Sequence, residues 1–162
     1  LKKYLLKEKK KQFIIIFTNH ILPKNLLKIK NCFFVNKHAS LLPSFAGLFP
    51  YIRTKIFNFK NGITIHLVID KIDSGKILYQ KVFNKEFKSM IDFYIYVFEN
   101  SPKYLLESIK SLKKKKFVKP KYSLSRYSLP SKKEFNYFLD CGGEVINISD
   151  FLRIKNLVRS YK

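Results

Sequence analysis

The sequence has few cysteines, few acidic residues and no long apolar run. Cys32 and Cys141 are far apart in the chain, and neither belongs to a C-x-x-C pair or stands beside a histidine, so we predict no disulfide framework and no metal site. No apolar run approaches the roughly 20 residues that a membrane-spanning helix needs. The opening segment also lacks the cleavage site of a signal peptide. We therefore expect no membrane association and a cytoplasmic location.

The shortage of acidic residues, 11 against 33 basic ones, leaves a formal net charge of +22. A basic surface of this kind binds nucleic-acid phosphates by releasing counterions. However, only four of the basic residues are arginine, whose planar fork suits phosphate and base recognition better than lysine. Abundant lysine, isoleucine, asparagine, phenylalanine and tyrosine are also what an A/T-biased coding sequence produces. Compositional drift and a functional basic surface both stay open, and any nucleic-acid binding is expected to be non-specific.

The chain does have core material, because 46% of its 162 residues are hydrophobic, which suffices for one domain. Runs of β-branched and aromatic residues predict strands at 12–17, 32–36, 63–69 and 77–83, and the first is apolar enough to be buried on both faces. Helices are predicted at 50–57, from Ser89 with a kink or a restart at Ser101–Pro102, at 131–140 and beyond Ser149, and a last short strand at 144–148. Strands joined by helices or long loops favour a three-layer α/β arrangement.

Polar side chains follow two of the predicted strands. Asn36 and His38 come at the end of one strand, and Asp70 and Asp73 follow the next strand. In an open α/β sheet, reacting groups collect beyond the carboxyl ends of neighbouring strands. The pattern therefore predicts an amide, an imidazole and a carboxylate near one another, although a histidine beside a carboxylate is structural more often than catalytic.

Four short motifs, taken in order, resemble the folate-dependent formyltransferases, a family that includes the methionyl-tRNA, glycinamide-ribonucleotide and amino-sugar enzymes. They are N-x-H-x-S-L-L-P from Asn36, G-x-x-P from Gly47, G-I-T-I-H from Gly62 and I-D-S-G-x-I from Ile72. The resemblance covers about residues 13–112. It implies a three-layer Rossmann-like α/β fold.

The same resemblance implies transfer of a formyl group from 10-formyltetrahydrofolate to a primary amine. Asn36 would hydrogen-bond the formyl oxygen, His38 would assist proton transfer, and Asp73 would orient His38 or a water and help to protonate the leaving nitrogen. The implied folate-contacting residues are Ile21, Leu22, Pro23 and Asp70. We expect the acceptor to be a small-molecule amine, with an amino sugar on a nucleotide carrier favoured over other amines.

The chain also departs from the family pattern. Ala46 stands where family members usually have a basic residue, just before the glycine of G-x-x-P. His66 matches a family histidine and is expected to be structural or to support the reacting groups from behind, whereas His20 matches nothing and is expected on the surface. The strands and glycine-rich turn with which these enzymes begin have no counterpart before residue 13. We therefore expect a fold truncated at its N-terminus, which a separate chain supplying the missing half would complete.

We divide the chain into a basic segment at 1–12, either a short charged helix or a loose tail, a formyltransferase-like domain at 13–112, and a lysine-rich connector with a helix–strand–helix extension at 113–162. Three hypotheses stay open. The chain is the catalytic half of a formyltransferase, a basic nucleic-acid-binding or scaffold protein that keeps the fold without activity, or a remnant without function. Binding of a folate analogue would distinguish the first from the other two.

Overall fold

A computed structural model describes residues 2–16 and 21–160, apart from the side chains of residues 157 and 160. The end of the predicted strand 12–17 and the predicted surface position of His20 therefore lie outside the described residues. No helix of the described part is both long enough and apolar enough to cross a membrane.

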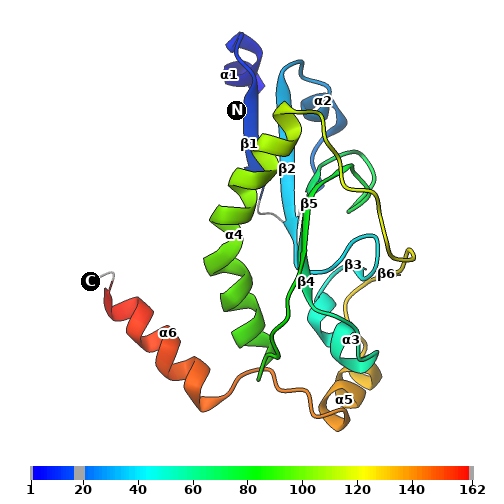
Figure 1. Cartoon of the computed structure of the whole chain (residues 1–162), viewed down its shortest axis with the longest axis vertical. Helices are drawn as coiled ribbons and strands as arrows, with labels where there is room; N and C mark the ends of the chain where they lie inside the picture. The colour runs from blue at the N-terminus through cyan, green and yellow to red at the C-terminus, as the bar shows by residue number, and fades with distance from the viewer. Residues whose placement is uncertain (1, 17–20, 161–162) are drawn as a thin grey trace.

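A mixed four-stranded sheet forms the centre of the fold, in the order β1-β2-β4-β5 (Figure 1). β1 is parallel to β2, while β4 is antiparallel to both β2 and β5. The strands are β1 (Gln12–Ile16), β2 (Cys32–His38), β4 (Gly62–Leu67) and β5 (Ile77–Val82). Their β-branched and aromatic side chains suit a pleated, half-buried surface.

The first strand lies at an edge of this sheet. Its residues are half-buried, and the side chain of Ile15 is 40% exposed. The prediction of a strand buried on both faces is therefore wrong for β1, because α4 packs against β4 and β5 and leaves part of the same face uncovered at β1.

Helices cover both faces of the sheet. Helix α4 (Met90–Lys113) packs against β4 and β5, on the face to which Val35 points. Because side chains alternate along a strand, Phe34 points to the opposite face, where it clusters with Leu5 of α1 (Lys2–Lys7) and residues of α2 (Lys24–Leu27). The predicted three-layer α/β arrangement is confirmed.

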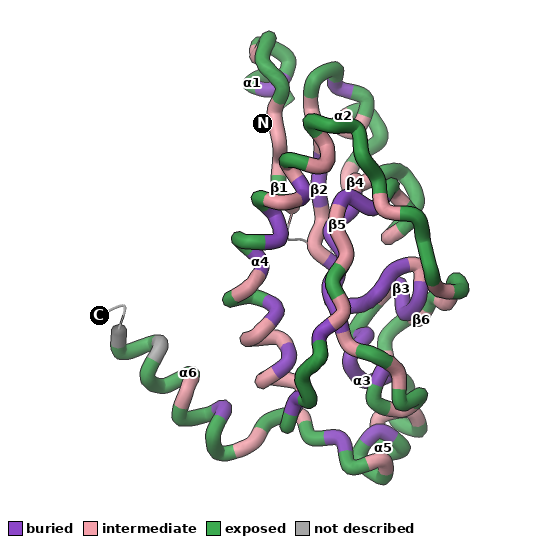
Figure 2. The backbone as a smooth tube through the Cα atoms, in the orientation of Figure 1, coloured by how far each residue is buried: buried purple, intermediate pink, exposed green. Residues whose placement is uncertain are grey.

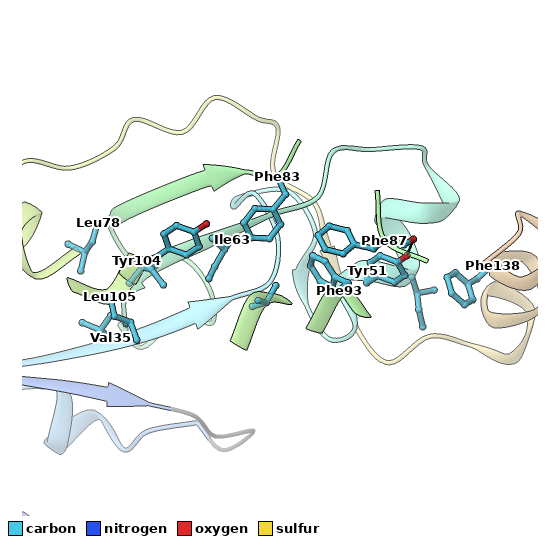
Figure 3. Close-up of a cluster of buried hydrophobic side chains, with 13 residues drawn as sticks. Val35, Tyr51, Ile63, Leu78, Phe83, Phe87, Phe93, Tyr104, Leu105 and Phe138 are labelled. Carbon is cyan, nitrogen blue, oxygen red and sulfur yellow. Dashed lines mark hydrogen bonds between the residues drawn. The ribbon is translucent and has the colours of Figure 1, made fainter. Parts of the chain in front are cut away.

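The main hydrophobic core lies between the sheet and α4 and continues toward α3 (Pro50–Ile56) and α5 (Lys132–Asp140) (Figure 3). Aromatic rings fill the part of this core near α3 and α5. The rings of Tyr51 and Phe93 stack 4.9 Å apart, and Phe138 of α5 is fully buried. In Figure 2 the buried side of α4 faces the strands. The predicted helices at 50–57 and 131–140 are confirmed, the second with its capping box between Ser131 and Glu134.

Two predicted features around α4 are not found, the restart of the helix at Ser101 and the strand at 144–148. The helix does not restart at Ser101, whose hydroxyl donates to the carbonyl of Val97 inside one continuous helix. Residues 144–148 form no strand, because the carbonyls of Glu144 and Val145 instead accept the first N–H groups of α4. The final helix α6 (Ile148–Ser160) confirms the helical tail. It begins beside the start of α4, where Arg153 forms ion pairs with Asp92 and Glu99, and its far end extends to one side of the molecule (Figure 1).

A small second sheet joins two distant parts of the chain. It pairs β3 (Ala46–Gly47) in parallel with β6 (Arg126–Tyr127), and in this register Ala46 lies opposite Arg126. β6 belongs to the segment that the sequence suggested was only a lysine-rich connector. The connector therefore returns to the loop that follows β2.

Candidate active site

Three polar side chains share one face of the sheet. β2 extends two residues beyond the predicted strand end at Asn36, so His38 lies within the strand and not after it as predicted. Asn36 is the direct cross-strand partner of His66 on β4. Residues two apart on a strand, and cross-strand partners, point to the same face. Asn36, His38 and His66 therefore point away from α4.

Asp73 reaches this face by a route that differs from the predicted one. Because β4 is antiparallel to β2, its carboxyl end at Leu67 lies beside Val35 and not at the carboxyl end of β2. The loop after β4 turns back, and it does so tightly, since a Cβ on Gly75 would lie 1.7 Å from the carbonyl oxygen of Leu67. Asp73 itself adopts a left-handed backbone conformation with φ of 49°.

The Asp73 carboxylate lies between two buried imidazoles. Its Oδ2 is 3.6 Å from Nδ1 of His38, and its Oδ1 is 3.6 Å from Nε2 of His66. All three side chains are at most 8% exposed. The N–H of Gly47 donates a 2.9 Å hydrogen bond to Oδ2. The backbone donor thus orients the carboxylate, and each of its two oxygens lies beside one ring.

The hydrogen bonds of the rings identify their basic nitrogens. Nε2 of His38 lies 2.9 Å from the carbonyl oxygen of Phe45, and Nδ1 of His66 lies 2.9 Å from that of Leu67. A carbonyl oxygen only accepts, so these two nitrogens hold the ring hydrogens. In the neutral rings, the remaining nitrogen of each therefore faces Asp73. A proton taken up by His38 therefore binds Nδ1, beside the Asp73 carboxylate, which stabilises the positive charge that forms.

The surroundings favour the neutral form of His38 and the ionised form of Asp73. Burial lowers the pKa of His38 below its usual 6.5, although Asp73 opposes the shift. Burial would raise the pKa of Asp73, but the imidazoles of His66 and His38, once protonated, and the N–H of Gly47 outweigh it and lower the pKa to about 2. At neutral pH the site therefore pairs a neutral imidazole with a carboxylate.

These groups open onto a cleft of about 840 Å³. Its walls are largely apolar, and much of that surface comes from side chains that are partly exposed at the mouth: Ile21, Leu22, Leu48, Phe49, Ile69 and Ile72. Asn36, His38, His66 and Asp73 all line it. Within the described residues, no group of three or more histidine, cysteine or acidic side chains is placed to hold a metal ion.

The predicted folate-contacting residues fall at one side of this cleft. Ile21 and Leu22 line it, and so does Asp70, which forms an exposed ion pair with Lys24 at 3.7 Å. Pro23 precedes α2 as its N-cap residue and is not among the lining residues.

Sequence reasoning missed the contribution of the connector. Arg126, Tyr127 and Ser128 line the cleft from the far end of the chain. No motif marks them, and the nearest signal was the missing basic residue at Ala46, which the register places opposite Arg126.

A sequence model of the family described as formyl transferase matches residues 2–86, which is more than half of the chain. The chain belongs to the formyl transferase family. Methionyl-tRNA formyltransferase of Natranaerobius thermophilus is 30% identical over 140 residues, covering 85% of this chain and 44% of the relative. A second relative of the same name, from Borrelia turicatae, is 34% identical over 114 residues, covering 68% of this chain and 37% of the relative. The chain thus spans less than half of these curated formyl transferases.

Solved structures share the fold of this formyl transferase chain. A sugar N-formyltransferase from Shewanella superposes with a TM-score of 0.64 at 19% identity, covering 86% of this chain and 62% of that one. A formyltransferase from Anoxybacillus kamchatkensis, solved in complex with UDP-4,6-dideoxy-4-formamido-L-AltNAc and tetrahydrofolate, gives 0.60 at 20% identity, covering 77% and 67%. The Rossmann-like α/β fold is therefore confirmed.

Proposed function

We propose that this chain contains the reacting groups of an enzyme that transfers a formyl group from 10-formyltetrahydrofolate to a primary amine. The observation on which this rests is the Asp73 carboxylate between two buried imidazoles, on the same sheet face as Asn36, at the bottom of an apolar cleft. Family membership supports the reaction class.

The cleft suits a reduced folate. Its volume falls within the roughly 300–1,000 Å³ of small-molecule sites, and its apolar mouth offers contact area for a planar pterin and the aryl group attached to it. The polar groups lie together at one place, where the formyl group would bind. We propose that Ile21 and Leu22 contact the pterin and that Asp70 and Pro23 lie at its outer edge.

The first step is attack of the amine nitrogen on the formyl carbon. A new C–N bond forms, and the carbonyl oxygen becomes an oxyanion of a tetrahedral intermediate. The amide N–H₂ of Asn36 is proposed to donate a hydrogen bond to this oxygen. A fixed neutral donor stabilises the developing charge without reorganisation, a contribution worth on the order of 10²–10³ in turnover.

Proton transfer completes the exchange. The attacking amine must lose a proton, and the proposed acceptor is Nδ1 of His38, the basic ring nitrogen, which lies 3.6 Å from Oδ2 of Asp73. The imidazolium that forms is stabilised by the Asp73 carboxylate. The proton then passes to N10 of the folate as the C–N10 bond breaks, which yields a formamide and tetrahydrofolate.

For the acceptor we propose a small-molecule amine, with an amino sugar on a nucleotide carrier tested first, as in the sugar formyltransferases that share the fold. Methionyl-tRNA is the second acceptor to test, because the curated relatives act on it by name and the net charge of +22 would attract its phosphates. A formylation assay with both acceptors distinguishes them.

We further propose that additional strands complete the sheet at β1. This strand lies at the sheet edge, and within the described residues its outer side pairs with no strand. A parallel strand from a separate chain, or from a longer form of this one, would satisfy its backbone groups and help to hold the acceptor.

Calorimetric titration with 5-formyltetrahydrofolate, a stable isomer of the donor, tests the proposed function. We expect saturable binding in the chain as it stands, at least about tenfold weaker in Asp73→Ala and unchanged in the surface variant Lys114→Ala. The absence of any saturable heat at millimolar ligand, in a chain whose circular dichroism shows it to be folded, would contradict the proposal.

A further inference from the structure

The end of the connector is bound tightly along the loop that follows β2. We call residues 123–128 the strap. Tyr127 stacks on Phe45 with ring centroids 5.9 Å apart, and a Cβ on Gly47 would lie 1.9 Å from the carbonyl oxygen of Tyr127. Five further hydrogen bonds join the two segments: Ser44 Oγ to Ser123 O, Phe45 N to Ser125 Oγ, Ala46 N to Ser125 O, Ser125 N to Pro43 O and Leu48 N to Tyr127 O.

The guanidinium of the strap binds the loop that contains Asp73. Nη2 of Arg126 donates to the carbonyl of Ile72 at 2.6 Å and to Oγ of Ser74 at 3.0 Å, so it contacts the residue on each side of Asp73. Asp73 needs such support, because its φ of 49° is disfavoured for a residue with a side chain. From the other direction, Gly47 donates its N–H to the carboxylate.

Arg126 also places a positive charge in the cleft, because it lines the cleft together with His38 and Asp73. Its partner in the β3–β6 register, Ala46, is fully buried and uncharged. The strap lies beyond the matched family segment at residues 2–86, so this charge comes to the cleft from another part of the chain.

We propose that Arg126 is a positioning residue of the formyl-transfer site, which fixes the Asp73 loop and adds a positive charge to the cleft that His38 lines. The inference rests on the proposed function for its purpose, but the contacts that it names exist in the chain without substrate.

The charge of Arg126 should be measurable at His38. The titratable and charged groups that face His38 are Asp73 from the loop after β4, His66 from β4 and Arg126 from β6. Asp73 raises the pKa of His38, whereas His66 and Arg126 lower it. Removal of the guanidinium therefore raises the pKa of His38. Greater access of solvent would raise it as well, so Arg126→Gln, which removes the charge but keeps most of the side chain, separates the two effects.

NMR of the full chain tests this directly, because there are only three histidines to assign. In Arg126→Ala we expect the titration midpoint of His38 to rise by a few tenths of a pH unit, the size expected for one partly screened charge. The amide of Gly47, which donates to Asp73, should exchange with solvent at least about tenfold faster. Arg126→Lys should keep the midpoint near that of the wild type, and Arg126→Gln should shift it as alanine does.

Arg159→Ala on α6 is the matched control, because it removes the same charge from an exposed position away from the cleft. If Arg126→Ala and Arg126→Gln leave the His38 midpoint at the value of this control, the proposal is overturned, whatever the exchange rates show. Should alanine impair folding, the lysine and glutamine variants give the same comparison. Neither readout needs a donor or acceptor, so failure of formyl transfer would not affect the outcome.

Discussion

Replacement of Asp73 by asparagine should change how the stability of the protein depends on pH. The pKa of this carboxyl falls from 3.8 to about 2 in the folded chain, and its side chain is only 8% exposed. A shift of that size corresponds to about 2.5 kcal/mol of stabilisation of the ionised form. The asparagine variant loses this contribution while it keeps nearly the same shape.

The sign follows from linkage. Because the folded-state pKa is lower than the unfolded value, the stabilisation is fully present above about pH 5 and is lost as the pH falls toward 2. The lowered pKa of His38 acts in the same direction, since the unfolded chain takes up that proton first as the pH falls below about 6.5. The same comparison in a His38→Gln background removes the titration of that ring.

Urea unfolding followed by circular dichroism at half-unit steps from pH 7 to 3 measures this dependence. We expect Asp73→Asn to be less stable than the wild type by about 2 kcal/mol at pH 6, with the difference shrinking as the pH approaches 3. Asp140→Asn, at an exposed site at the end of α5, is the control and should follow the wild type. Parallel curves for wild type and Asp73→Asn between pH 5 and 3 would refute the reasoning.

Three further perturbations have defined outcomes. Gly75→Ala should weaken 5-formyltetrahydrofolate binding in calorimetry at least about tenfold, because the new Cβ would meet the carbonyl of Leu67 at 1.7 Å and displace the Asp73 loop; unchanged affinity would contradict this. Burial lowers the pKa of Lys37 to about 8, below its unfolded value of 10.5. The free energy of unfolding of the wild type, measured in urea, should therefore rise between pH 8 and 10.5. Lys37→Met, which can still pack on the Phe98 ring, should not show this rise. Affinity for unrelated DNA duplexes should fall by roughly 10³ or more between 50 and 200 mM salt, and a sequence preference that survives the higher salt would favour a specific nucleic-acid function.

Local signals in the sequence were sufficient for most elements. The capping box at Ser131 fixed the start of α5, because its two hydrogen bonds form within four residues. The same kind of signal misled at Ser101–Pro102, where the buried face of a long helix outweighs the loss of one backbone hydrogen bond at proline. Residues 144–148 have strand-forming side chains, but their carbonyls are used to satisfy the first turn of α4.

The sequence predicted which residues lie together at the candidate site, but not how the strands and loops bring them together. The motif around Asn36 and His38 placed them side by side, and the structure adds His66 as the cross-strand partner of Asn36. The direction of β4 depends on long-range pairing and could not be read from the sequence. Asp73 was therefore predicted to follow a strand end next to that of β2, whereas the loop after the antiparallel β4 turns back to bring it there. Arg126 could not be found at all, because nothing local in a lysine-rich connector marks a contact with a loop 80 residues earlier.

The pairing of Ala46 with Arg126 has a consequence for synthesis of the chain. At roughly 5–20 residues per second, a ribosome needs several seconds to extend from one residue to the other. During that interval the nascent protein already contains Asn36, His38 and Asp73, but the loop around Asp73 lacks the guanidinium that holds it. Translation order therefore makes the strap the last part of the cleft to be assembled, and a ribosome stalled before residue 123 would present a chain that has Asn36, His38 and Asp73 but lacks the guanidinium contacts of the Asp73 loop.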